Sequence, residues 1–113
     1  MAQSESELQA IIVAYFRYNY PQYLIYSSLN GVKISGSNKY GIIAKQKKEG
    51  MLNGVADLEV ILPNKVLFIE LKTAIGKQSP DQIVMQQKLT ELGHSYYLVR
   101  SLEEFKQVIS KHL

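Results

Sequence analysis

Apolar residues recur at intervals of three and four near both ends of the chain, which is the spacing of one face of an α-helix. The N-terminal stripe contains Leu8, Ile11, Ile12, Tyr15 and Phe16. The C-terminal stripe contains Leu102, Phe105, Val108 and Ile109. In front of each stripe a serine is followed three residues later by a glutamate, which predicts capping boxes at Ser4 and Ser101. The pattern therefore predicts a helix near each end, the first of which ends before Pro21.

Two further helices are predicted between these ends. Residues 79–92 begin with Ser79-Pro80-Asp81, which combines an N-cap serine, a proline at the first helical position and an acid in the first turn. Gly93 is expected to end this helix. Residues 40–49 predict a short lysine-rich helix, with Gly50 as its C-terminal cap.

Four apolar runs with strand composition lie at residues 23–28, 57–62, 65–72 and 95–100. The two middle runs flank a turn at Pro63-Asn64-Lys65 and are apolar on both faces, which predicts a hairpin of central strands covered on two sides. The last two strands and the helix between them predict a βαβ crossover. The order α-β-(short α)-β-β-α-β-α therefore predicts an α/β layer fold with a mixed sheet.

The composition supports one domain spanning residues 1–113 and narrows the classes of function. Hydrophobic residues make up 46% of the chain, which is enough for a core. No apolar run approaches the roughly 20 residues of a membrane span, and the first residues lack a signal-peptide pattern, so we expect neither. The absence of cysteine excludes disulfides, thiolate zinc sites and a cysteine nucleophile, and agrees with a cytoplasmic location.

Positive charge is concentrated around the short helix. The net charge is +3, and five lysines of this segment are opposed there only by Glu49. They are Lys33, Lys39, Lys45, Lys47 and Lys48. Such a segment can contact phosphates, or it can be a solvated loop and helix face. Asn30-Gly31 and the polar residues 32–39 predict a turn and a mobile loop here.

The hairpin brings acidic and basic groups to one strand end. Its turn returns Glu70 and Lys72 to the neighbourhood of Asp57, and because strand side chains alternate, Glu70 and Lys72 share a face. The two carboxylates and the backbone carbonyl of Leu71 are oxygen ligands of the kind that Mg²⁺ takes. Lys72 can then activate a water or stabilise charge on a phosphate. The alternative is a structural aspartate beside a surface Glu–Lys pair.

Together, these motifs resemble the PD-(D/E)XK nuclease superfamily, whose core is αβββαβ, and within it the VRR-NUC (virus-type replication–repair nuclease) domains, especially the small stand-alone phage forms. The resembling segments follow the family order along nearly the whole chain. They are Glu5-Ser6-Glu7-Leu8-Gln9, Asn30-Gly31, Glu49-Gly50 with Gly54-Val55-Ala56-Asp57, Ile69-Glu70-Leu71-Lys72, Ser79-Pro80-Asp81-Gln82, Leu92-Gly93-His94 and Tyr97-Leu98-Val99-Arg100-Ser101. Ala56 stands where the family has a proline. Because proline offers no metal ligand, we expect activity to survive this difference. Residues 32–48 match least well.

The resemblance implies a restriction-endonuclease-like fold and a role for each motif residue. Asp57 and Glu70 would be metal ligands, and Lys72 would be the catalytic lysine. Glu5 lies at the edge of the first helical stripe, where position alone allows either an exposed first-turn residue or an inward functional group. The resemblance implies that Glu5 reaches the metal, directly or through water. Gln82 would help to hold the metal-bound water or the scissile phosphate.

The leading hypothesis is therefore a Mg²⁺- or Mn²⁺-dependent endodeoxyribonuclease, and the resemblance implies branched DNA, such as four-way junctions or flaps, as its substrate. The residues expected to contact DNA are Lys39, Lys45, Lys47, Lys48 and Ser79, the last at a helix N-terminus. A chain of 113 residues has little surface to grip a branched duplex, so we expect a homodimer. One alternative is a non-catalytic DNA-binding module that retains the nuclease fold. Another is a phage structural or packaging accessory protein, which would bind neither DNA nor metal.

Overall fold

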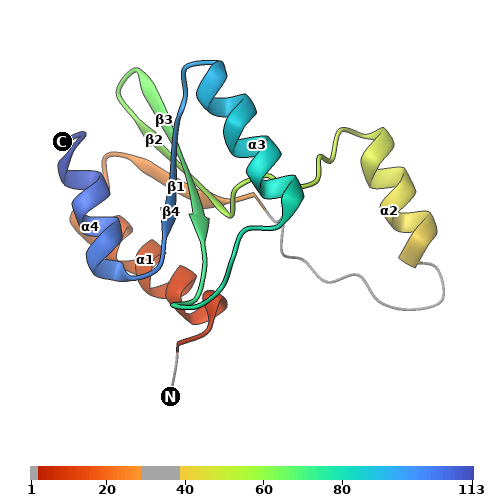
Figure 1. The fold of residues 1–113 in the computed structure, drawn as a ribbon. Helices are drawn as coiled ribbons and strands as arrows, with labels where there is room; N and C mark the ends of the chain where they lie inside the picture. Colours follow the sequence, from red (N-terminus) through yellow and green to blue (C-terminus); the bar gives the residue numbers. More distant parts are fainter. Residues whose placement is uncertain (1–2, 29–38) are drawn as a thin grey trace.

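The computed structural model describes residues 3–28 and 39–113, and within them the chain forms four helices and one four-stranded sheet (Figure 1). The helices are α1 (Glu5–Asn19), α2 (Lys39–Lys48), α3 (Pro80–Glu91) and α4 (Leu102–Ser110). The strands are β1 (Leu24–Ser27), β2 (Leu58–Leu62), β3 (Lys65–Leu71) and β4 (Ser95–Val99). The predicted order is confirmed, and each boundary predicted as a range lies within one residue of the observed one. Lys33, the predicted turn at Asn30-Gly31 and residues 32–38 of the predicted loop lie outside the described residues.

The sheet is mixed, with the strand order β1-β2-β3-β4, as the sequence predicts. Strands β1, β2 and β3 pair antiparallel, whereas β4 pairs parallel to β3 after the chain has crossed over through α3. Leu62 pairs with Lys65 at the end of the hairpin, and Asn64 in the turn between them has a φ of 61°. Asparagine tolerates this left-handed conformation better than most residues do. Because the strand order is β1-β2-β3-β4, the two strands of this hairpin form the centre of the sheet.

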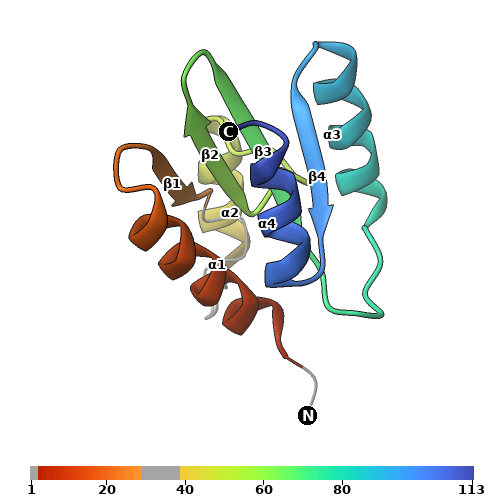
Figure 2. The same ribbon diagram turned by 90° about the vertical axis from the view of Figure 1, so that its left-hand side faces the viewer.

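The main hydrophobic core lies between the sheet and the helices α1 and α4, which cover the same face (Figure 2). Phe16 of α1 and Phe105 of α4 are fully buried, and their ring centroids are 6.2 Å apart. The sheet contributes Ile25, Leu58, Val60, Leu62, Leu67, Ile69, Leu71 and Val99. The two predicted helical stripes are thus confirmed, except that Ile11 is 41% exposed and lies outside the core.

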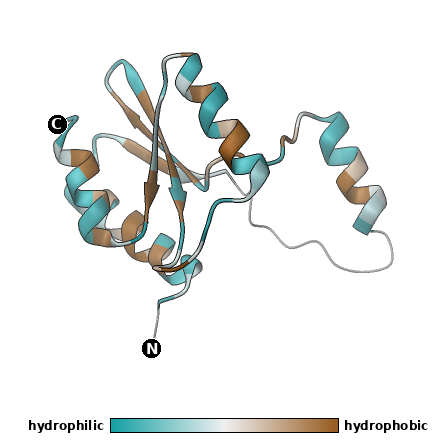
Figure 3. Ribbon diagram, viewed as in Figure 1, coloured by the Kyte–Doolittle hydropathy of each residue, from teal (hydrophilic) through white to brown (hydrophobic). Residues whose placement is uncertain are grey.

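The opposite face of the sheet is covered more sparsely. Helix α3 packs against β4 without burying any of its own residues fully, and Ile83 remains 43% exposed. Helix α2 packs against no other described helix or strand and stands away from the body (Figure 1). Both helices are largely hydrophilic, with isolated apolar patches (Figure 3). Among residues 3–28 and 39–113, no helix has the length and apolar character needed to cross a membrane.

Serine caps fix the start of three helices. Ser4 accepts a hydrogen bond from the Glu7 N–H at 3.0 Å. Ser79 and Gln82 form a complete capping box, in which each side chain accepts the backbone N–H of the other residue. At Ser101 the serine half forms, but the Glu104 carboxylate accepts from the N–H of Arg100 instead, at 2.8 Å. The cap at Ser79 bears directly on function, because α3 begins beside the acidic cluster described next.

Candidate metal centre

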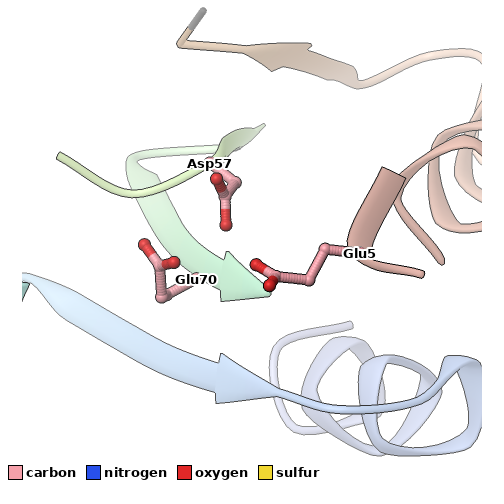
Figure 4. Close-up of side chains that lie close together, drawn as sticks. All are labelled: Glu5, Asp57 and Glu70. Carbon is pink, nitrogen blue, oxygen red and sulfur yellow. The ribbon is translucent and has the colours of Figure 1, made fainter. Parts of the chain in front are cut away.

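Three carboxylates from different elements meet at one edge of the sheet (Figure 4). Asp57 directly precedes β2, Glu70 lies next to last in β3, and Glu5 is the first residue of α1. The hairpin register pairs Leu58 with Ile69, so Asp57 arrives beside the end of β3. Asp57 Oδ2 accepts the Leu71 N–H at 2.8 Å, which fixes the aspartate against the strand. Local pairing within the hairpin therefore brings together the Asp57 and Glu70 that the sequence singles out.

The three side chains offer one oxygen each within 4.8 Å of one another. Glu5 is exposed, Asp57 is half-buried, and Glu70 is only 1% exposed. The Glu70 Oε1 atom is buried and has no hydrogen-bond partner among the described residues. A buried carboxylate oxygen without a partner is unfavourable on its own, and this one lies among other carboxylates. These donors suit a hard divalent cation, which takes oxygen ligands.

The electrostatics of Glu70 follow from this crowding. Burial raises the pKa of Glu70, and the neighbouring negatively charged Asp57 raises it further, to about 9. The Lys72 Nζ lies 3.9 Å from Glu70 Oε2 and lowers this pKa, but it compensates for only part of the effect. Without a bound cation, Glu70 therefore holds its proton tightly. A divalent cation would compete with this proton for the same oxygens.

Gln82 reaches the cluster from the first turn of α3. Its Nε2 donates to Glu70 Oε2 at 2.9 Å, while its Oε1 accepts the Ser79 N–H at 2.9 Å. The capping box thus determines which end of the amide faces the carboxylate. Close packing also fixes the start of α3, since a Cβ added to Gly54 would lie 2.6 Å from the carbonyl carbon of Asp81. The sequence predicts Gln82 at the site, and the structure shows that its amide hydrogen-bonds to the Glu70 carboxylate.

Three neutral polar residues that hydrogen-bond to one another were not predicted as part of the site: Gln78, Gln86 and Tyr96. Gln78 Nε2 donates to Gln86 Oε1 at 3.0 Å and to the Tyr96 hydroxyl at 3.4 Å. Burial and the charge of Glu70 raise the pKa of Tyr96 to about 12. The β3–β4 register pairs Phe68 with Tyr96, which places Tyr96 on the same face of the sheet as Glu70. Strand alternation was the available signal, although it does not reveal the glutamine contacts.

The other predicted residues are not part of this cluster. Lys39, Lys45, Lys47 and Lys48 all lie on α2, away from the sheet. The Ser79 hydroxyl accepts the Gln82 N–H at 3.2 Å and so serves as a cap. Leu71 is fully buried at the end of β3, and its predicted role as a carbonyl ligand stays a prediction.

Comparison with solved structures relates the fold to known proteins. A structure described as "VRR_NUC domain protein" superposes with a TM-score of 0.73 at 18% identity, covering 99% of this chain and 89% of the other. A structure described as "VRR_NUC domain" gives a TM-score of 0.64 at 22% identity, covering 96% of this chain and 97% of the other. No family model and no curated protein matches the sequence. The chain thus has the fold of VRR-NUC domains, which confirms the predicted resemblance at the level of structure.

Proposed function

We propose that this protein is a divalent-metal-dependent DNA endonuclease that hydrolyses phosphodiester bonds, with branched DNA such as junctions or flaps as its substrate. The observation that carries the proposal is the convergence of Glu5, Asp57 and Glu70 beside Lys72, with one buried Glu70 oxygen that has no partner in the described part of the chain. The similarity in fold to VRR-NUC domains supports the same function. Mg²⁺ or Mn²⁺ is the cation that such oxygen donors favour.

Each residue has a distinct task in this proposal. Glu5, Asp57 and Glu70 hold the cation, which supplies a Lewis acid for a phosphoryl oxygen and makes a water molecule more acidic. Asp57 is kept in place by the Leu71 N–H, and Glu70 is oriented by the Gln82 amide. The Lys72 ammonium faces the site and stabilises the negative charge that develops on the phosphate as water adds.

The remaining surface provides DNA contacts. Lys45, Lys47 and Lys48 occupy the last turn of α2, whose side chains are free of the core and can reach phosphates. We also propose a homodimer, in which two cluster sites act on a symmetric branched substrate. Apolar side chains that the monomer leaves uncovered support this proposal, since Leu52 is 61% and Ile42 is 37% exposed. A fully active preparation that sediments only as a monomer would contradict the homodimer.

Cleavage of a panel of linear, flap and four-way DNA with Mg²⁺, Mn²⁺ or chelator tests the proposal. We expect metal-dependent cutting of branched DNA that Glu70→Gln lowers by about a hundredfold or more. Glu91→Gln is the matched control, because Glu91 is exposed at the far end of α3. Cutting at the wild-type rate by Glu70→Gln would show that the site is assigned wrongly. DNA binding without cleavage under both metals would favour the non-catalytic DNA-binding module.

A further inference from the structure

Ile75 is an apolar side chain that the described fold leaves almost entirely in solvent. It is 91% exposed, the largest value among the large hydrophobic residues that the structure describes. It occupies a tight turn between β3 and α3, in which the Gly76 N–H donates to the Thr73 carbonyl at 3.2 Å and to Thr73 Oγ1 at 3.0 Å. A single exposed apolar residue needs no explanation on its own, so the significance of Ile75 depends on how this turn is held and where it lies.

The turn is fixed by a charged side chain from the end of β4. The Arg100 Nη1 donates to the carbonyls of Thr73 and Gly76, at 2.6 and 2.7 Å. These two residues flank the turn on either side of Ile75, so both ends of the turn are held by one nitrogen. Glu104 accepts the Arg100 N–H at 2.8 Å and steadies the clamp from α4. A side chain displayed on a rigid turn loses little conformational freedom when it enters a binding partner.

The turn also lies directly beside the acidic cluster. Lys72 precedes it and stands 3.9 Å from Glu70, and a Cβ added to Gly76 would lie 3.6 Å from Lys72 Cδ. On the other side follows the exposed Lys77. Ile75 thus has one lysine before it and one after it in the sequence, and an apolar side chain with basic neighbours suits a polyanion that has apolar surfaces between its charged strands. Nucleic acid has this character, and isoleucine is among the side chains that proteins insert between base steps.

We propose that Ile75 is a wedge that inserts at an unstacked base step next to the phosphate being cleaved. The inference rests on the proposed nuclease function and deepens it by giving a physical basis for substrate choice. At a branch point or flap the bases are already partly unstacked, so the side chain enters there without opening an intact helix. A linear duplex must be unstacked first, which disfavours it as a substrate. Ile75 is thus a specificity-determining residue, and Arg100 positions it.

The test combines cleavage with a direct measurement of base unstacking. Cleavage rates of flap and linear DNA are compared for wild type, Ile75→Ala and Ile75→Leu. Binding of the same flap, with 2-aminopurine at the branch, is followed by fluorescence with Ca²⁺ in place of Mg²⁺. Leu92→Ala is the control, because Leu92 is 62% exposed at the opposite end of α3. Ile75 makes no core contact that its truncation would remove, so the variants should fold as wild type does.

We expect Ile75→Ala to lower flap cleavage by about tenfold and to leave the slower cutting of linear duplex within about twofold. The fluorescence rise on binding should fall in Ile75→Ala, return in Ile75→Leu and stay unchanged in Leu92→Ala. Equal flap cleavage and equal fluorescence for wild type and Ile75→Ala would overturn the wedge while leaving the nuclease intact. A change from dimer to monomer in Ile75→Ala would also overturn it, by making Ile75 a protein contact. Wild type that neither binds nor cuts DNA would overturn both proposals.

Discussion

The two faces of β3 carry side chains of opposite character. Ile69 and Leu71 point into the core beneath α1 and α4, and both are fully buried. Glu70, between them, points to the α3 side, where it meets Gln82 and Lys72. Because side chains alternate along a strand, neighbouring residues of β3 have different tasks: one packs in the core and the next belongs to the acidic cluster. The apolar face holds the hairpin in place, and the polar face displays a carboxylate at a fixed position.

The two faces also contribute to stability with opposite sign. The core face gains free energy from buried apolar surface and close packing. On the other face, Glu70 is buried, one of its oxygens has no partner within residues 3–28 and 39–113, and its pKa is raised to about 9. Proteins tolerate such features where function needs them and stability elsewhere is sufficient. Substitutions on the two faces should therefore move stability in opposite directions.

The largest effect on stability is expected on the core face, from Phe105→Ala. Phe105 is fully buried and contacts the rings of Phe16 and Tyr15. Its truncation should lower the free energy of unfolding by about 3–5 kcal/mol, since a cavity replaces the ring. Denaturant unfolding followed by circular dichroism measures this. Phe105→Leu keeps most of the apolar volume and should lose clearly less; an equal loss would mean that ring packing is not what stabilises this face.

The polar face should respond in the reverse direction, through Glu70→Gln. Glu70 has a normal pKa of 4.5 when unfolded and a pKa of about 9 when folded, so the folded state binds the proton more tightly. The contribution of this group is fully present below about pH 4.5 and is lost as the pH rises toward 9, because the side chain, which is ionised in the unfolded chain, must then take up a proton on folding. An amide at this position does not titrate. We expect Glu70→Gln to be more stable than wild type by about 1–3 kcal/mol at pH 8 in chelator, and the difference to vanish near pH 4.

Divalent metal should reduce this difference in stability at pH 8 by stabilising wild type. Mg²⁺ or Mn²⁺ that binds the folded state stabilises wild type at pH 8, and the variant gains less because it has lost a charged ligand. Thermal unfolding of both proteins at pH 4 and pH 8, with and without metal, measures how pH and metal change the stability of each protein. Stability of wild type and variant that changes in parallel with pH would contradict the raised pKa. A melting temperature that no divalent metal shifts would contradict the metal centre.

The contrast between the faces also explains how far the sequence could predict this protein. Hairpin pairing is local, so the approach of Asp57 to Glu70 follows from the turn and from period-two alternation. The partner of Gln82 could not be predicted, because it depends on which way the amide faces, and the capping box at Ser79 decides that. Strand alternation could place Tyr96 on this face, but its contact with Gln78 could not be predicted, since the two residues come from separate segments. The lysine-rich helix was predicted, but its separation from the sheet depends on tertiary packing.

Helix α2 extends the comparison to a region that belongs to neither face. It buries no residue and packs against no other described element, so replacing its lysines should leave stability unchanged. Changing Lys45, Lys47 and Lys48 together to glutamine should weaken DNA binding by about tenfold at moderate salt. The slope of log affinity against log salt should also become flatter, by up to about 0.9 for each phosphate that the variant no longer neutralises. Fluorescence anisotropy over a salt series measures both quantities. The same number of lysines removed elsewhere, at Lys88, Lys106 and Lys111, controls for net charge. Equal weakening by the two triple variants would mean that overall charge, and not contact through α2, attracts the DNA.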